Sequence, residues 1–190
     1  MNRLEILPHD ALIIVDVQND FLPNGALAVP NGDRVIPVLN KMIDDFKKAN
    51  SPVFATRDWH PVDHCSFKEQ GGPWPPHCVQ NSYGAEFSKD LHLPKDAILI
   101  SKADNPQQEA YSNFSGTDLS EKLAKLGIKR IIVGGLATDY CVKETVLDAR
   151  KIGLEVVVIE NGIEAVNVHT SDDKKAIQSM QDAGAIFVSI

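Results

Sequence analysis

The chain has 190 residues, of which 43% are hydrophobic and 24% charged, and this composition excludes a disordered or fibrous protein. Its formal net charge of −7, without a basic run, argues against nucleic acid or an anionic membrane as a partner. No apolar run approaches the roughly 20 residues of a membrane span. Three widely spaced cysteines do not form a disulfide framework, and the N-terminal stretch lacks the pattern of a signal peptide, so we expect a cytoplasmic protein.

Short runs rich in β-branched residues alternate with amphipathic stretches along the chain. Such near-continuous apolar runs fit strands that are covered on both faces, and their alternation with helices predicts a parallel sheet between two helical layers. We therefore expect a single α/β domain over residues 1–190, with about six strands. The expected strands are 11–17, 52–57, 97–101, 128–135, 154–160 and 185–190, and the expected helices lie within 33–50, 117–127, 138–153 and 170–184.

One segment interrupts this alternation. Residues 58–94 follow the second expected strand and are rich in Pro, His, Trp and Gly. A long irregular insertion in a compact domain is usually functional or disordered, and these aromatic and histidine residues argue against disorder. Because ligands of open parallel sheets bind beyond the carboxyl ends of the strands, we expect the insertion to form part of a binding site there.

Reactive side chains follow the ends of several expected strands. Taken singly, each has an ordinary interpretation: a strand-end Asp is often a turn former, a strand-end Lys is usually solvated, and a lone Cys is more often inert core than nucleophile. Their shared location at one edge of the sheet is the stronger indication of a site. The residues are Asp16, Asp58, His60, Lys102 and Cys141.

The position of Cys141 favours the nucleophile interpretation. Thr138 or Asp139 is a suitable N-cap, which places Cys141 in the first turn of a helix, where the helix dipole favours a thiolate. The Gly134–Gly135 pair allows a tight turn before that helix, with amide groups free to bind a developing oxyanion.

Two further strand-end residues suit roles beside that thiol. Asp16 is the expected acceptor of the Cys141 proton. Lys102 is expected to hold Asp16 and to support negative charge. The alternative, in which the thiol is a small apolar core group, remains open at this stage.

The insertion also carries a candidate metal site. Asp58 and His60 alternate in extended chain, so their side chains point the same way, and His77 returns later in the segment. This set of ligands suits zinc, iron or manganese. His64 is a competing ligand, and a set of hydrogen-bonded loop histidines is the alternative interpretation. Phe21, Trp74 and Tyr111 are candidates to line a small apolar pocket nearby, although ordinary packing would explain them equally.

Taken together, these motifs resemble the nicotinamidase branch of the isochorismatase-like cysteine hydrolase family. The likeness covers essentially the whole chain, and the combination of motifs is highly specific. It implies a Rossmann-type three-layer sandwich. The motifs are DVQNDF (16–21), DWHPVDHCSF (58–67), WPPHCV (74–79), SKADNPQQEAYSNF (101–114) and GLATDYCVKETVLDA (135–149).

The resemblance implies roles for the catalytic residues. Cys141 is expected to be the nucleophile, Asp16 the general base and acid, and Lys102 the third catalytic group. The Leu136–Ala137 peptide corresponds to a cis bond of the family, which is expected to direct the amides of Ala137 and Cys141 at the oxyanion.

The resemblance also implies a metal ion. Asp58, His60 and His77 are expected to bind one divalent ion, zinc in the first place, with iron(II) or manganese(II) as alternatives. Family members differ in a further protein ligand, and both His64 and Ser66 lie in the variable stretch, so we assign neither.

The expected reaction is hydrolysis of nicotinamide to nicotinate and ammonia through a cysteine thioester, in NAD salvage, with pyrazinamide as a further substrate. Phe21 and Trp74 are expected to sandwich the pyridine ring, with Tyr111 and Ala137 as further contacts. Two alternatives stand beside this expectation. The substrate could be another small carboxamide or a ureide, or the protein could be a non-catalytic binding or redox module. A homo-oligomer is compatible with the sequence.

Overall fold

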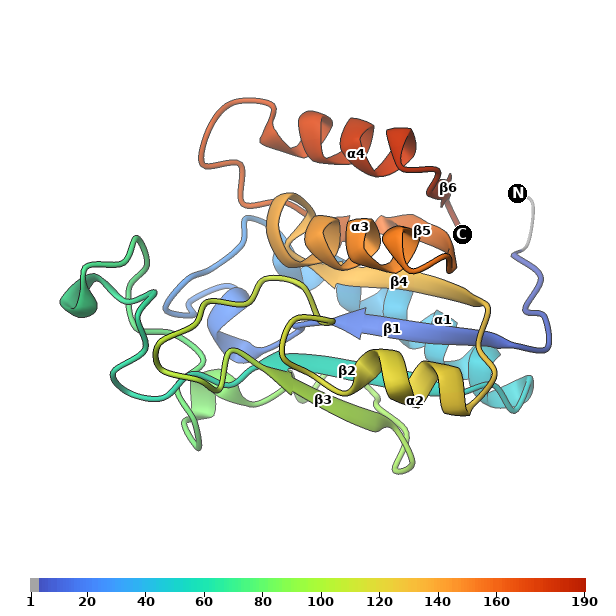
Figure 1. The fold of residues 1–190 in the computed structure, drawn as a ribbon, viewed down its shortest axis with the longest axis horizontal. Helices are drawn as coiled ribbons and strands as arrows, with labels where there is room; N and C mark the ends of the chain where they lie inside the picture. Colours follow the sequence, from blue (N-terminus) through green and yellow to red (C-terminus); the bar gives the residue numbers. More distant parts are fainter. Residues whose placement is uncertain (1–3) are drawn as a thin grey trace.

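The computed structural model describes residues 4–190, and residues 1–3, where the N-terminal stretch begins, lie outside the described residues. Six strands pair in parallel throughout and form one sheet, as the sequence predicts. The strands are β1 (Asp10–Val15), β2 (Val53–Asp58), β3 (Ile98–Lys102), β4 (Arg130–Leu136), β5 (Glu155–Glu164) and β6 (Ile186–Val188). Their spatial order is β3-β2-β1-β4-β5-β6 (Figure 1).

Helices cover both faces of this sheet (Figure 1). One face is covered by α1 (Val35–Lys48), which buries a stripe at the three- and four-residue spacing of an amphipathic helix, including Leu39, Met42 and Phe46. The other face carries α2 (Leu119–Lys125) and α3 (Lys143–Lys151). The last helix, α4 (Asp172–Asp182), packs beside α3. None of the helices described within residues 4–190 has the length and apolar character that would let it span a membrane.

In the central strand β1, the five residues after Asp10 are apolar without interruption. Leu12 and Ile14 point into the hydrophobic core beneath α1, whereas Ala11, Ile13 and Val15 point into the core beneath α2 and α3. All five side chains are completely buried. Successive side chains of a strand alternate between faces, so a strand with a helical layer on each side needs apolar residues at every position.

The segment after β4 differs from the prediction of a regular helix beginning at Thr138 or Asp139. Thr138–Val142 form a π-helical turn, in which the Val142 N–H donates to the Ala137 carbonyl at 3.1 Å, and the regular helix α3 starts only at Lys143. Ala137 occupies the N-cap position without a capping side chain. Such π turns concentrate at functional positions in helices.

The glycine pair before this turn also has a different role from the one predicted. Gly134 and Gly135 lie inside β4, not in the turn that follows it. A Cβ atom on Gly135 would lie 2.1 Å from the Val15 carbonyl oxygen, and Gly135 has φ +128°. Glycine is therefore required here by the close approach of β1 and by the backbone conformation.

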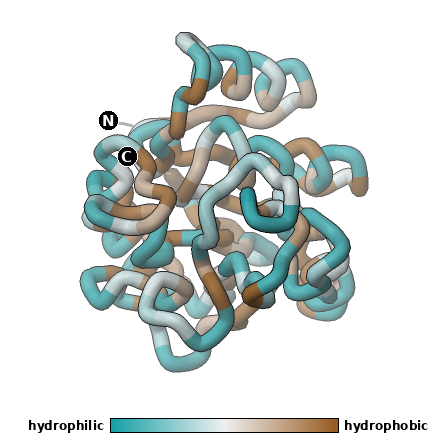
Figure 2. The backbone as a smooth tube through the Cα atoms, turned by 90° about the vertical axis from the view of Figure 1, so that its left-hand side faces the viewer, coloured by the Kyte–Doolittle hydropathy of each residue, from teal (hydrophilic) through white to brown (hydrophobic). Residues whose placement is uncertain are grey.

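The insertion (58–94) begins at the carboxyl edge of the sheet, toward which the strand arrows point in Figure 1, and its last residues return to the opposite edge, where Pro94 lies. It has little regular structure but is tied together by parallel bridges between His60 and Val79 and between Phe67 and Trp74. Figure 2 faces the carboxyl edge and shows loops of mixed hydropathy crossing in front of the sheet.

Candidate active site

Asp16 directly follows β1 and is completely buried. Its backbone has φ +50°, which lies in the left-handed region that residues other than glycine rarely adopt and that recurs at functional sites. The Thr56 hydroxyl donates to Asp16 Oδ1 at 2.6 Å and so fixes the orientation of the carboxylate. Thr56 lies on the neighbouring strand β2 and was not predicted as a site residue.

Lys102 is the last residue of β3 and the centre of a buried cluster of charges. Its Nζ atom lies 3.0 Å from Asp16 Oδ2 and 3.4 Å from Cys141 Sγ, and it also donates to Asp58 Oδ1. Burial alone would lower the pKa of Lys102, but the two carboxylates raise that pKa well above its usual value. Lys102 is therefore a permanent cation between the Cys141 thiol and two carboxylates.

Cys141 lies in the π-helical turn, with 6% of its surface exposed. Burial raises the pKa of its thiol well above the usual value, and the nearby Lys102 only partly offsets this rise. The resting thiol is therefore protonated, which differs from the thiolate expected from a helix N-terminus. A base is needed to activate this cysteine.

Asp16 is placed to be that base. Reactive atoms of Asp16 and Cys141 lie within 4.8 Å of each other. Burial raises the pKa of Asp16, with Lys102 opposing the rise, so this carboxylate has more affinity for a proton than an exposed one. Asp16 Oδ2 lies 3.0 Å from Lys102 Nζ, and no other hydrogen-bond donor among the described residues reaches it.

Asp58, His60 and His77 form a second cluster at the same edge. One potential ligand atom of each lies within 4.8 Å of the others, and all three side chains are buried. Asp58 also pairs with Lys102, and a carboxylate with two oxygens can serve both a lysine and a cation. Burial raises the pKa of Asp58, but the Lys102 cation outweighs this and keeps the carboxylate ionised.

The two histidines are held in the form that binds metals. His60 Nδ1 lies 3.0 Å from the His77 carbonyl oxygen, and His77 Nδ1 lies 2.8 Å from the Pro75 carbonyl oxygen. A carbonyl only accepts, so both Nδ1 atoms carry hydrogen and each Nε2 keeps a lone pair. Burial also lowers the pKa of His60 to about 4, which keeps its ring neutral. The cluster therefore fits a divalent ion such as zinc.

His64, the competing ligand, is engaged elsewhere. Its Nε2 atom lies 3.1 Å from the Gln108 carbonyl oxygen and must therefore carry hydrogen. Its Nδ1 atom then accepts from the Ser66 hydroxyl at 2.7 Å. Neither nitrogen keeps a free lone pair for a metal ion. The bond to Gln108 instead connects the insertion to the loop that follows β3.

We expect His64→Gln to keep its bound metal. Metal analysis of the purified variant, beside the same analysis of His60→Gln, checks this expectation: only the second variant should lose the ion. Equal loss of metal from both variants would show that His64 rotates to become a ligand.

All three predicted aromatic residues lie around one cavity, the site pocket, which also contains His60, His77, Ala137 and Cys141 in its wall. Trp74 Nε1 donates to the Tyr111 hydroxyl at 3.0 Å, so a hydrogen bond joins these two residues of the pocket wall. The Leu136–Ala137 peptide is cis, at the position the resemblance indicated. Asp16 and Lys102 do not line the pocket but lie buried near the Cys141 side chain.

Several residues of the site pocket were not predicted. Tyr140 directly precedes Cys141 and makes an edge-to-face contact with Trp74, with ring centroids 5.2 Å apart. Its position next to Cys141 in the chain was the one available signal. Glu109 lies inside the quoted 101–114 motif but was given no role. The remaining residues lie outside the quoted motifs: Leu27, Val29 and Val166.

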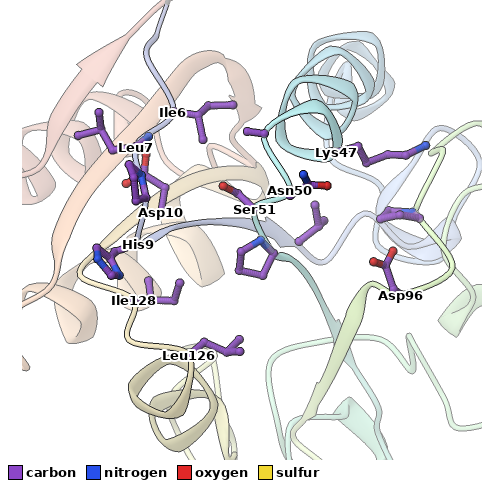
Figure 3. Close-up of a pocket in the computed structure, with 15 residues that line it drawn as sticks. Ile6, Leu7, His9, Asp10, Lys47, Asn50, Ser51, Asp96, Leu126 and Ile128 are labelled. Atoms are coloured by element: carbon purple, nitrogen blue, oxygen red, sulfur yellow. Dashed lines mark hydrogen bonds between the residues drawn. The ribbon is translucent and has the colours of Figure 1, made fainter.

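A larger hollow of about 940 Å³ lies at the opposite edge of the sheet (Figure 3). Figure 3 shows that its wall combines polar and apolar side chains, among them His9, Lys47, Asp96 and Leu126. It contains neither a cysteine nor a pair of histidines. The smaller site pocket, which has both, is therefore the better candidate for chemistry.

Comparison with known proteins places the chain in a family. Residues 10–190 match the isochorismatase domain, and the chain therefore belongs to the isochorismatase family. The nicotinamidase of Escherichia coli (strain K12) is 41% identical and aligns over 97% of this chain and 96% of its own length. The nicotinamidase/pyrazinamidase of Mycobacterium tuberculosis is 34% identical, over 94% of this chain and 97% of its own.

Solved structures agree with this assignment. The pyrazinamidase of Pyrococcus horikoshii in complex with zinc superposes with a TM-score of 0.92 at 49% identity, covering 96% of this chain and all of that one. PnC1 from L. infantum in complex with nicotinate has a TM-score of 0.88 at 37% identity, covering 96% and 93%. These matches confirm both the predicted fold and the resemblance read from the motifs.

Proposed function

We propose that this protein is a nicotinamidase, which hydrolyses nicotinamide to nicotinate and ammonia and thereby serves NAD salvage, and that it also hydrolyses pyrazinamide. One observation carries the proposal. A buried thiol beside a carboxylate and a fixed lysine opens into a pocket that also holds two metal-competent histidines and aromatic walls. Full-length relatives with this activity support it.

The first half of the reaction forms a thioester. Asp16 takes the proton of Cys141, and the thiolate attacks the carboxamide carbon. Lys102 stabilises the negative charge on sulfur before the attack. The backbone amides of Ala137 and Cys141 then stabilise the oxyanion of the tetrahedral intermediate. Asp16 returns the proton to the leaving nitrogen, the carbon–nitrogen bond breaks, and ammonia departs.

The second half releases the acid. Asp16, again ionised, takes a proton from water, and the resulting hydroxide attacks the thioester carbon. The carbon–sulfur bond breaks, nicotinate leaves, and the proton returns to the Cys141 sulfur. Phe21 and Trp74 keep the ring in place through apolar contact during both halves.

We further propose that the resident ion is zinc and that Asp58, His60 and His77 hold it. The zinc complex of the Pyrococcus horikoshii protein supports this choice, and iron(II) and manganese(II) suit the same ligands. When bound, the ion supplies a positive charge that anchors the ring nitrogen and draws electron density from the ring.

His60→Asn is expected to lose the ion and to raise the Michaelis constant for nicotinamide by about tenfold or more. The substitution removes a metal ligand whose ring is held in place by the bond from its Nδ1 atom to the His77 carbonyl oxygen. Metal analysis and steady-state kinetics on one preparation check both effects. His169→Asn, a change at an exposed histidine, is the control. Full metal occupancy in His60→Asn would contradict the ligand assignment.

The experiment that tests the proposed function compares nicotinamide with benzamide, which has the same carboxamide but lacks the ring nitrogen. We expect the purified protein to release ammonia and nicotinate in equal amounts from nicotinamide, and much less ammonia from benzamide. Absence of release from nicotinamide, with the metal bound and the Cys141 thiol reactive, would contradict nicotinamide as the substrate.

A further inference from the structure

Asp139 is a buried acid that the reaction described above does not use. It lies two residues before Cys141 in the π-helical turn and exposes 6% of its surface. Its Oδ1 atom accepts the backbone N–H of Val166 at 3.0 Å, and its Oδ2 atom accepts the backbone N–H of Asn167 at 2.8 Å. Both oxygens of the carboxylate thus hold consecutive amides of one distant turn.

That turn belongs to the segment between β5 and α4 and reaches the site pocket. Val166 contributes to the pocket wall together with Cys141 and Tyr140. Asn167 adopts φ +54° and accepts the Asp173 N–H at 2.9 Å through its side chain, which anchors the turn to the start of α4. The position of Val166 therefore depends on contacts made behind the pocket wall.

We propose that Asp139 is a positioning residue that sets the Val166 wall of the site pocket and so controls how closely the pocket fits its substrate. The same short turn then carries Cys141 and, through Asp139, fixes the Val166 part of the pocket wall. This inference rests on the proposed function, because it concerns the binding of that substrate.

The physical reason is the strength of hydrogen bonds to a buried carboxylate. Such charge-assisted bonds are stronger than neutral ones, and two of them converge on adjacent amides. Asp139→Asn keeps one acceptor but places an NH₂ group against a backbone N–H, so one bond becomes a repulsive contact. The turn should then relax, and Val166 should no longer hold one position.

We expect Asp139→Asn to weaken substrate binding while the groups proposed to carry the reaction, Asp16, Lys102 and Cys141, keep their places. Asp139→Asn should raise the Michaelis constant for nicotinamide about tenfold and leave the turnover number within about threefold, because a lost charge-assisted bond weakens fit while Asp16 and Lys102 keep their contacts. Alkylation of Cys141 by iodoacetamide, measured on the peptide that contains it, should keep its wild-type rate.

A double-variant cycle with Val166→Ala separates positioning from a general structural role. If Asp139 acts through Val166, the Michaelis constant of the double variant should match the larger single effect. Multiplied effects, or a lower melting temperature of Asp139→Asn with an unchanged Michaelis constant, would overturn the proposal. Asp172→Asn is the matched control, since Asp172 accepts one amide of the same segment, His169 N–H at 2.8 Å, but does not line the site pocket.

Hydrogen exchange at the Val166 and Asn167 amides gives a readout that does not depend on the substrate. Exchange should accelerate in Asp139→Asn and not in Asp172→Asn. Unchanged exchange in both variants would overturn the positioning role even if nicotinamide is hydrolysed. Conversely, a wild-type protein inactive on nicotinamide would contradict the proposed function, while faster exchange confined to Asp139→Asn would still support the contact between Asp139 and the pocket wall.

Discussion

Cys141→Ala is expected to lower turnover of nicotinamide by at least about 10⁴-fold, because a mechanism that passes through a thioester has no route without its sulfur. The substitution removes one buried atom and leaves the Asp16–Lys102 contact in place, so the protein should remain folded. Initial rates of ammonia release and a thermal unfolding curve, measured on the same preparation, check the two halves of this expectation.

Cys65→Ala is the appropriate control for that variant. All three cysteines are free, and Cys65 is partly exposed on the insertion rather than placed beside Lys102. It should keep wild-type turnover. A Cys141→Ala protein that retains more than about one hundredth of the wild-type rate would contradict the assigned nucleophile, since loss of a nucleophile ordinarily costs several orders of magnitude.

Asp16→Asn is expected to lower the turnover number by about 10²–10⁴-fold, which is the usual contribution of a positioned general acid–base group. The variant is nearly isosteric, and its side-chain oxygen can still accept the Thr56 hydroxyl bond. It cannot take the thiol proton, and the raised pKa of the Cys141 thiol means that few molecules are ionised without help. Steady-state kinetics at saturating nicotinamide measure this effect.

The control for Asp16→Asn lies at the start of the strand that Asp16 follows. Asp10, at the other end of β1, is also buried and pairs with Arg130, with the Asp10 Oδ2 and Arg130 Nη2 atoms 2.6 Å apart. Asp10→Asn should reduce the melting temperature but leave the turnover number unchanged. If the two variants lose activity to the same extent, Asp16 acts through stability and its role as the base is contradicted.

Lys102 is less suited to such a test. Its removal would leave the carboxylates of Asp16 and Asp58 buried without their shared cation. Breaking a buried ion pair by removing one partner typically costs about 3–5 kcal/mol, so the variant would lose stability as well as activity. The two effects could not be separated by a rate measurement alone.

The sequence was sufficient for the features that depend on local pattern. Ala11–Val15 of β1 are all apolar because a helical layer covers each face of the strand, and this pattern is visible in the chain itself. Asp16 and Lys102 were found because each stands where an apolar run stops, and parallel strands bring such ends to one edge. The closeness of Asp16 and Lys102 in space therefore followed from the parallel order of the strands.

Features that depend on distant partners were not predictable. The Thr56 contact with Asp16 and the Gln108 contact with His64 join segments about 40 residues apart, and no local pattern indicates that either pair should meet. Asp139 was predicted as a possible N-cap because Asp favours that position. Its carboxylate instead holds the Val166 turn, a tertiary contact that outweighs the local preference.

Rapid acid quenching of the protein during its first turnover of nicotinamide, followed by peptide mass spectrometry, tests the central claim most directly. The account predicts a single nicotinoyl group attached to the Cys141 peptide, and no such adduct in Cys141→Ala. A nicotinoyl adduct on any other residue, or nicotinate formed by Cys141→Ala at the wild-type rate, would contradict it.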